Sequence, residues 1–371
     1  MTARARLRDL LHLMSIPKIS DRKVIALVEH FGSSDALLSA DPKLLIEVPG
    51  IRDSDASLIR HTPVDDAAID RQFSLINKLN GSILSYWDPA YPALLRTIYD
   101  PPPLLFVRGA ISEADHHSIA IVGTRHPTHY GTAQTERFAE ALVRRGITVV
   151  SGLARGVDTV AHTTVLRNGG RTVAVLGGSV DKIYPRENER IVQQIESTGV
   201  GAVISELPMG TPSHPGFFPR RNRIISGMSA GTLIIESDRN GGAMITAATA
   251  LDQNRELFCL PGPVSERKSN GPNMLIRKGQ AKLIQTVDDI IEELIVHLHP
   301  VLKKPSADVP LPPLTVFEQL ILDHVSPEPV HIDRIAEQTR LSSSDVLVNL
   351  LGLEFKGVIR QLPGKFFIRT L

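Results

Sequence analysis

The feature that most constrains the fold is a series of six short apolar runs between residues 118 and 262. Each run is rich in β-branched residues and apolar on both faces, as parallel strands covered by helices must be. Amphipathic sequence separates the runs. The pattern predicts an α/β fold with a doubly wound, Rossmann-like parallel sheet. The six runs are SIAIVG (118–123), TVVSG (148–152), TVAVLG (172–177), AVISE (202–206), GTLIIES (231–237) and ELFCLPG (256–262).

Residues 1–80 have apolar side chains at helical spacing and show no strand alternation. The turns at 16–20 and 48–51 resemble helix-hairpin-helix connections, and the second keeps a glycine, Gly50. The sequence therefore predicts a small helical domain of the SAM or helix-hairpin-helix kind. A helical bundle that only packs and binds nothing is the alternative for this region.

Residues 81–298 form the predicted Rossmann-like domain, and residues 299–314, with five prolines, a predicted linker. In 315–371, amphipathic helices precede two β-like runs around a Pro-Gly turn, which predicts a winged helix. Its candidate recognition segment, SSSDVLVNLLGLEFKG, has one basic residue. Because readers of the major groove need basic or amide side chains, this favours protein interaction or weak duplex binding.

Charge and cysteine usage limit the function classes. With 41 Lys and Arg against 40 Asp and Glu, the net charge is +1, so a nucleic-acid site must be a local concentration of positive charge. The single cysteine, Cys259, excludes an intramolecular disulfide and a multi-cysteine zinc site. No apolar stretch is long enough for a transmembrane helix. We expect a cytoplasmic protein without membrane association or bound metal.

Glycine and basic residues follow several of the predicted strands. Helix N-termini at such turns present free N–H groups and the positive end of the helix dipole, which together favour anions. The residues in question are Gly123, Arg125, Gly152 and Lys182, with Gly241, Gly242 and Thr246 after a later strand. Neither the dinucleotide fingerprint nor the P-loop pattern is present, so no nucleotide cofactor is predicted.

Three arginines crowd the start of a predicted helix, where acids are usual, and this favours an anionic ligand. Pairing with Glu206 or Glu236 is reasonable for single arginines but strained for all three. The neighbouring Phe217 and Phe218 either stack on unpaired bases or belong to the core. Repeated anion sites along one edge suit a polymer with repeating phosphates. The arginines are Arg220, Arg221 and Arg223.

Asp158 and His162 lie one helical turn apart after the second strand. A helix cap, a salt bridge or a structural hydrogen-bonded pair is commoner for such residues than a catalytic dyad.

Five segments in order resemble the motifs of the DNA-processing protein A (DprA/Smf) family, over about residues 85–295. They are VGTR followed by YG, SGLARGVDTVAH, LGGSVDKIYPREN, FPRRNRIISGMS and NGGAMITAATA, after which LPGPVSERKSNGPNMLIRKGQAKLI completes the resemblance.

The resemblance implies a protein without enzymatic activity that binds and protects incoming single-stranded DNA and helps to load RecA recombinase in natural transformation. It implies a homodimer formed through Asn273, Met274, Leu275 and Ile276. The nucleic-acid-binding residues that it implies are Arg125, Lys182, Arg220, Asn222 and Arg223, with glycines shaping the groove.

The alternative is a Rossmann-type nucleotide phosphoribohydrolase-like enzyme. Such enzymes carry an acid in a P-G-G-x-G-T-x-x-E loop, and the corresponding NGGAMITAATA has none, so a general acid/base is missing. A transcription regulator with a small-molecule sensor is a second rival, but an acidic ribose clamp is not evident.

Overall fold

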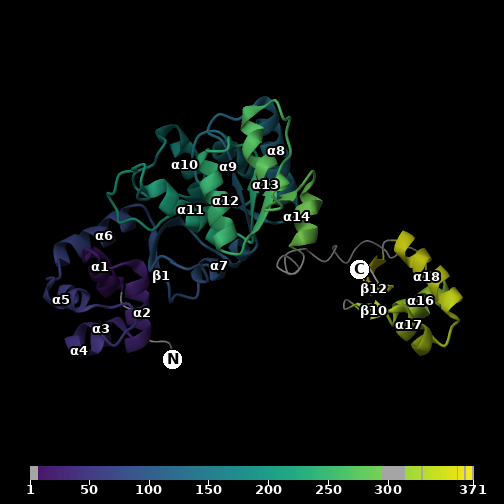
Figure 1. The fold of residues 1–371 in the computed structure, drawn as a ribbon, viewed down its shortest axis with the longest axis horizontal. Helices are drawn as coiled ribbons and strands as arrows, with labels where there is room; N and C mark the ends of the chain where they lie inside the picture. Colours follow the sequence, from purple (N-terminus) through teal and green to yellow (C-terminus); the bar gives the residue numbers. More distant parts are fainter. Residues whose placement is uncertain (1–6, 295–313, 327–328, 357, 363–364, 370–371) are drawn as a thin grey trace. The chain divides into compact units, whose positions relative to one another are not determined.

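The computed structural model describes residues 7–294, 314–326, 329–356, 358–362 and 365–369 (Figure 1). Contacts divide the chain into two compact units, Met1–Val301 and Leu302–Leu371. The predicted proline-rich linker, residues 299–314, lies outside the described residues except for Leu314. No helix among the described residues is long and apolar enough to span a membrane.

Six helices open the described part of the first unit. Local capping sets their limits: the Ser20 hydroxyl accepts the Lys23 N–H at the start of α2, and Gly32 ends that helix in a left-handed conformation. The two predicted hairpin turns each contain one left-handed residue, Lys18 (φ 67°) and Gly50 (φ 88°). The helices are α1 (Leu7–Ser15), α2 (Asp21–Phe31), α3 (Ser34–Ser39), α4 (Pro42–Leu45), α5 (Asp53–His61) and α6 (Asp66–Lys78).

The six predicted strands are all present, and the prediction of a mainly parallel, doubly wound sheet is confirmed. Within the described residues the sheet has nine strands in the order β1-β2-β6-β5-β4-β3-β7-β8-β9. The seven neighbouring strands from β6 through β5, β4, β3, β7 and β8 to β9 are parallel. Strand β2 pairs with β6, and β1 pairs with β2, in antiparallel orientation. The strands are β1 (Ser82–Ser85), β2 (Leu104–Gly109), β3 (Ser118–Val122), β4 (Thr148–Ser151), β5 (Thr172–Val175), β6 (Gly201–Ser205), β7 (Gly231–Ile234), β8 (Glu256–Cys259) and β9 (Lys282–Leu283).

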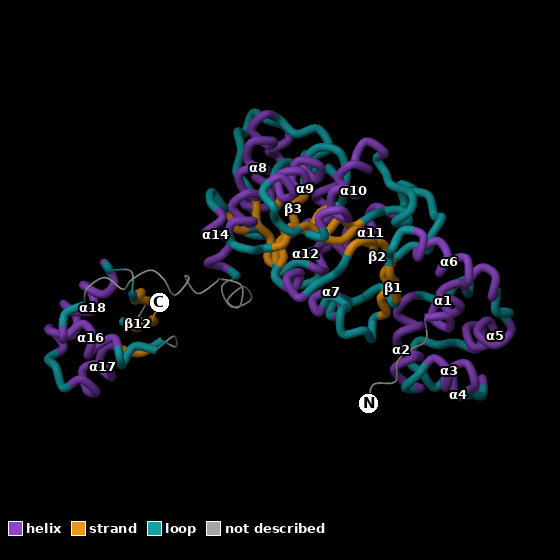
Figure 2. Tube along the Cα trace, turned by 180° about the vertical axis from the view of Figure 1, so that it is seen from behind, coloured by secondary structure: helices purple, strands orange, loops and turns teal. Residues whose placement is uncertain are grey.

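Helices cover both faces of the sheet, as Figure 2 shows. In β5, Ala174 faces the apolar cluster that includes α9 and α10, while Val173 and Val175 face α11 and α12. The helices are α7 (Ala93–Arg96), α8 (His129–Arg144), α9 (Val157–Arg167), α10 (Glu189–Thr198), α11 (Phe217–Met228), α12 (Gly242–Asp252), α13 (Asn270–Arg277) and α14 (Val287–Glu293), with short 3-10 turns η1 (Glu113–His116), η2 (Arg186–Asn188) and η3 (Arg267–Ser269).

The apolar core runs without a break from the six helices into the sheet. Leu10 of α1 and Ile76 of α6 belong to the same buried cluster as Ile83 of β1 and Phe106 of β2. The boundary predicted near residue 80 therefore marks a change of secondary structure within one compact unit. As a limit between domains it stays a prediction.

The second unit has the helices and three-stranded sheet of a winged helix, as predicted. Its strand order is β10-β12-β11, and its core includes Ile335, Leu350 and Phe367. The predicted Pro-Gly turn lies outside the described residues. The elements are α16 (Val316–Leu322), β10 (Val330–His331), α17 (Ile332–Thr339), α18 (Ser343–Phe355), β11 (Ile359–Leu362) and β12 (Phe366–Arg369).

Candidate nucleic-acid interface

A small pocket opens at the carboxyl ends of three neighbouring strands, β3, β4 and β5, beside the start of α11. In an open parallel sheet, ligands bind at this edge because loop amides and helix N-termini gather there. Two of the predicted site residues, Arg125 and Gly152, are in its lining. The lining residues are Arg125, Gly152, Ala154, Arg155, Gly177, Tyr184, Pro185, Phe218 and Arg221.

The rim of the pocket combines positive charge with aromatic rings. The exposed Arg125 holds its guanidinium carbon 5.3 Å from the centre of the Phe218 ring. Tyr184 lies 6.2 Å from Phe218, at an angle of 36° between the rings, and is 47% exposed. Phe218 itself is half-buried, so its ring is not fully enclosed in the core. A guanidinium beside an open ring can bind a phosphate and stack with a base at the same place.

Arg221 forms the buried wall of this pocket. Its Nη1 donates to the carbonyl oxygens of Gly152 and Val175. Burial lowers the pKa of Arg221 to about 10, so the side chain keeps its charge at neutral pH. Gly152 has a packing reason to lack a side chain, because a Cβ there would overlap the guanidinium.

Asp158 holds the backbone of the turn that carries Gly152. Its Oδ2 accepts the backbone N–H groups of Gly152 and Ala154, each at 3.2 Å. Burial raises the pKa of Asp158, while the positive charge of Arg221 opposes this shift. Asp158 is therefore a hydrogen-bonded structural acid that fixes the turn after β4.

His162 forms its hydrogen bond with Thr172 and not with Asp158. Its Nδ1 lies 2.7 Å from Oγ1 of Thr172, whose hydroxyl donates to the Val149 carbonyl, so Nδ1 carries the hydrogen. Burial, with the positive charge of Arg221, lowers the pKa of His162 to about 3. The two residues thus have separate partners, and they form no catalytic dyad in this structure.

The three arginines at the start of α11 all have partners inside the protein. The Arg223 guanidinium, 7% exposed, pairs with Glu206 and also contacts Asp100. Arg220 Nη2 lies 3.0 Å from Glu206 Oε2. As expected, pairing with Glu206 or Glu236 does not serve all three: Glu206 pairs with Arg220 and Arg223, whereas Arg221 donates to backbone carbonyls.

Arg220 nevertheless keeps an open side, since its side chain is 44% exposed. Lys182 is exposed on the loop that also carries Tyr184, and the half-buried Asn222 accepts a hydrogen bond from Nε of Arg221. DNA contacts by Arg220, Lys182 and Asn222 stay predictions. A contact by Arg223 also stays a prediction, and it would require the ion pair with Glu206 to open.

The remaining predicted positions lie away from the pocket lining. Gly123 lacks a side chain where Val157 packs, and Gly241 lacks one beside the Ser237 hydroxyl. Gly242 faces open space at the start of α12, whereas Thr246 is buried in that helix. Thr246 therefore does not present its hydroxyl to solvent in this structure.

Sequence reasoning missed Arg155 and Tyr184. Arg155 lies in the glycine-bounded turn after β4, and its guanidinium pairs with Glu187 at 2.8 Å and 3.0 Å. Arg155 could have been found from its position, because SGLARG places an arginine between two glycines directly after a predicted strand. The pattern around Tyr184 contained no comparable signal.

Glu236 occupies the point where the strand order reverses, between β3 and β7. Its carboxylate accepts the backbone N–H of Thr128 at 2.9 Å and the Thr128 hydroxyl, at the N-terminus of α8. Dinucleotide-binding proteins hold a pyrophosphate at the corresponding place. A carboxylate there repels phosphate, which agrees with the missing dinucleotide fingerprint.

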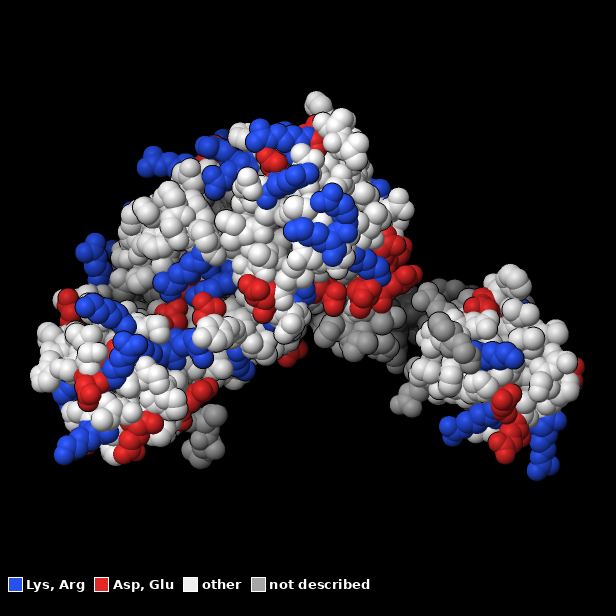
Figure 3. All heavy atoms as spheres, in the orientation of Figure 1, with Lys and Arg blue, Asp and Glu red and all other residues white. Residues whose placement is uncertain are grey.

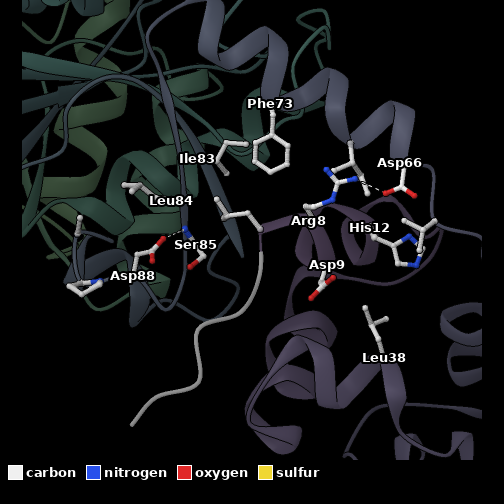
Figure 4. Close-up of a pocket in the computed structure, with 15 residues that line it drawn as sticks. Arg8, Asp9, His12, Leu38, Asp66, Phe73, Ile83, Leu84, Ser85 and Asp88 are labelled. Carbon is white, nitrogen blue, oxygen red and sulfur yellow. Dashed lines mark hydrogen bonds and ion pairs between the residues drawn. The ribbon is translucent and has the colours of Figure 1, made fainter.

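A larger groove of about 890 Å³ lies between α1, α6 and β1 (Figure 4). Its walls are largely apolar, and Arg8 is paired with Asp66 at 2.5 Å and with Asp70. Asp9 and Asp88 add further negative charge. Because its acids outnumber its bases, the groove does not suit a nucleic acid. Among the described residues, no cluster of His, Cys, Asp and Glu is arranged to hold a metal ion.

On the face shown in Figure 3, uncharged surface separates the basic side chains of the α/β part, acids gather along its lower edge, and bases and acids are mixed on the helical segment. This agrees with the near-zero net charge and leaves local clusters to provide any attraction for DNA.

The winged helix exposes an apolar face. On α18, Leu347, Val348 and Leu351 are exposed, and Phe355 is 91% exposed. The helix contains no Lys or Arg. The prediction of protein interaction or weak duplex binding stays open, although an apolar face fits the former better.

Comparison with known proteins gives family matches to all three parts of the chain. The model of DNA recombination-mediator protein A matches residues 82–295, that of the DprA winged helix domain residues 305–365, and that of the SAM-like helix-hairpin-helix tandem residues 10–60. Protein Smf of Escherichia coli is 39% identical over 284 residues, covering 74% of each chain. DNA processing protein DprA of Streptococcus pneumoniae is 33% identical over 276 residues, covering 74% of this chain and 94% of that protein.

Two solved structures are similar as well. The X-ray structure of DNA processing protein A from Streptococcus pneumoniae superposes with a TM-score of 0.68 at 29% identity, covering 78% of this chain and 99% of that one. DNA processing protein A from Helicobacter pylori, described for its single-stranded DNA binding mode, gives a TM-score of 0.52 at 31% identity, covering 58% and 96%.

Proposed function

The chain belongs to the DNA recombination-mediator protein A family, and we propose on this premise that it binds single-stranded DNA and acts in DNA processing during natural transformation. The observation that carries the proposal is the pocket at the ends of β3, β4 and β5, with Arg125 and Arg221 beside Phe218 and Tyr184. The single-stranded DNA binding described for the Helicobacter pylori relative supports it.

The chemistry of the pocket favours a single strand. Arg125 offers an exposed guanidinium to a phosphate, and Arg221 adds a fixed positive charge behind it. Tyr184 presents a ring face on which an unpaired base can stack, an interaction of about 1–3 kcal/mol per base. A duplex hides its base faces, so it can use the charges but not the ring.

We propose Lys182, Arg220 and Asn222 as further phosphate contacts along the same edge, since all three lie on the loops and helix start beside the pocket. A contact by the cationic Lys182 adds to the salt dependence of binding because it releases counterions, whereas the neutral Asn222 adds a hydrogen bond without such release.

Loading of RecA recombinase and dimerisation through α13 complete the proposal. The description of the family as a recombination mediator supports the first. For the second, Met274 and Ile276 of α13 are only half-buried, and the nearby Val264 is 92% exposed. The cytoplasm, where RecA acts on DNA, is the proposed compartment.

We propose a binding role rather than an enzymatic one. Asp158 and His162, the two residues considered as a catalytic pair, are buried and engaged in internal hydrogen bonds. The stretch that corresponds to the acid-bearing loop of the phosphoribohydrolases forms α12 and carries no acid at the last motif position.

Arg125→Ala tests the site. We expect weaker binding of a labelled single-stranded oligonucleotide and a plot of log affinity against log salt that is shallower by about 0.7, the value for one lost phosphate contact. Fluorescence anisotropy across salt concentration measures both quantities. Arg167→Ala is the matched control, because Arg167 lies at the opposite end of α9 from the pocket. Equal affinity and slope for both variants and the unchanged protein would exclude the pocket as the DNA site.

A further inference from the structure

Asp21, the first residue of α2, reaches across from the helical segment to the arginines of α11. Its Oδ2 lies 2.7 Å from Nη2 of Arg220 and 3.4 Å from Nη2 of Arg223. The Asp21 side chain is 18% exposed. A residue far away in the sequence thus places a carboxylate against the most basic helix start of the α/β part.

Other contacts hold the helical segment in this position. The Arg22 guanidinium lies 3.7 Å from the centre of the Tyr99 ring. The Gln72 side chain accepts the Met209 N–H at 2.7 Å and donates to the Met209 carbonyl at 3.4 Å. Because these contacts do not involve Arg220, Asp21 stays close to Arg220 whether or not their ion pair is formed.

The charges of this cluster are compensated within the protein. Glu206 is buried, and its Oε2 already serves both Arg223 and Arg220. Asp21 contacts both arginines, whereas Asp100 contacts Arg223 alone. Without Asp21 the partly exposed Arg220 would keep only Glu206, which it shares with Arg223.

We propose that Asp21 is part of the DNA site, as an internal competitor that takes the guanidinium donors of Arg220 in place of a DNA phosphate. A carboxylate and a phosphate use the same N–H donors of arginine with similar geometry. DNA reaches Arg220 by displacing Asp21, and the helical segment thereby sets the affinity for single-stranded DNA. This inference rests on the proposed function.

Salt dependence distinguishes the competitor from a merely structural ion pair. A phosphate that displaces Asp21 gains a cation but leaves the Asp21 carboxylate without its partner, so little net charge is neutralised, few counterions are released from the DNA, and the contact adds little to the salt slope. When Asp21 loses its charge, Arg220 keeps only the carboxylate of Glu206 that it shares with Arg223, and it can pair with a phosphate without displacing an acid. Binding then becomes tighter at low salt and more sensitive to salt.

The test is fluorescence anisotropy of the full chain with a single-stranded oligonucleotide, comparing Asp21→Asn, Arg220→Ala and the double variant. We expect Asp21→Asn to tighten binding about two- to fivefold, the factor that corresponds to an exposed ion pair, and to steepen the salt slope by about 0.7. In the Arg220→Ala background the same change should have no effect. Glu47→Gln, an equal charge change at an exposed position of the helical segment, should leave binding unchanged.

Asp21→Ser provides a second charge-removing variant that keeps a polar residue at the helix start, and thermal unfolding checks that each variant is folded. If Asp21→Asn and Asp21→Ser both bind with the affinity and slope of the unchanged protein, while Arg125→Ala binds more weakly, the competitor is refuted and the DNA site stands. If the unchanged protein shows no salt-dependent binding, the proposed function fails and the competitor fails with it.

Discussion

The side chain of Arg223 in α11 is buried, and its guanidinium contacts both Glu206 and Asp100. Removing one partner of a buried ion pair costs about 3–5 kcal/mol, because it leaves an uncompensated charge. We therefore expect Arg223→Ala to lower the free energy of unfolding by about 3 kcal/mol, measured by denaturant titration. Arg190→Ala, at an exposed position of α10, should change it little. An Arg223→Ala protein of unchanged stability that binds DNA weakly would instead support the predicted DNA contact by Arg223.

His162 makes stability depend on pH. Its pKa is about 3 in the folded protein, because burial opposes the charge, and about 6.5 when unfolded. Between these values the unfolded chain binds a proton that the folded chain does not, so stability falls as pH falls. Above pH 6.5 the titration of His162 does not reduce the free energy of unfolding. At pH 5 it reduces the free energy of unfolding by about 2 kcal/mol.

His162→Gln removes this titration while keeping a side chain that can hydrogen-bond to Thr172. Denaturant unfolding at pH 7 and pH 5 should show a smaller loss of stability for the variant than for the unchanged protein. An equal loss in both proteins would show that His162 is not the group that titrates.

Some site residues could be predicted from the sequence and others could not, for a physical reason. Arg125 and Gly152 directly follow apolar runs, and the carboxyl ends of parallel strands meet at one edge. Tyr184 lies in a loop without periodicity, so its exposure depends on how the loop folds. Asp21 is 199 residues from Arg220, and only tertiary structure brings them together.

At the scale of elements, the sequence predicted the six parallel strands β3 to β8 but neither the buried antiparallel strand β2 nor the edge strands β1 and β9. Strands β3 to β8 read as continuous apolar runs because helices cover both sides. β1 alternates between buried and exposed positions over four residues, and β9 has only two residues. Such short or half-exposed segments contain too few apolar residues to stand out from loops.

Helix α13 makes the dimer proposal testable. Leu275 points into the core, while Met274 and Ile276 remain half-buried and can contact a second copy. We expect Ile276→Glu to shift the protein from dimer to monomer in light scattering coupled to size-exclusion chromatography, since a charge in an apolar interface is costly. Val264→Glu, on the nearby exposed loop, tests how far the interface extends. A protein that is monomeric before any substitution would contradict the dimer.

For the whole molecule, binding depends on local charge rather than on net charge. The chain carries +1 overall, and much of its basic surface is interleaved with acids. The helical segment shares a core with the sheet and places Asp21 at the arginine cluster, so it belongs structurally to the DNA-binding unit. Sequence spacing predicted the helical segment and strands β3 to β8 of this unit but could not predict how the helices pack on the sheet.

Fluorescence anisotropy with one labelled oligonucleotide, single-stranded and as its duplex, tests the central claim most directly when it is carried out across salt concentration. Charges and ring faces at one pocket predict tighter binding of the single strand, weakening as salt rises. Equal affinity for the duplex would show that stacking of bases on Tyr184 and Phe218 does not contribute to binding. Absence of single-strand binding at low salt would contradict the proposed DNA site.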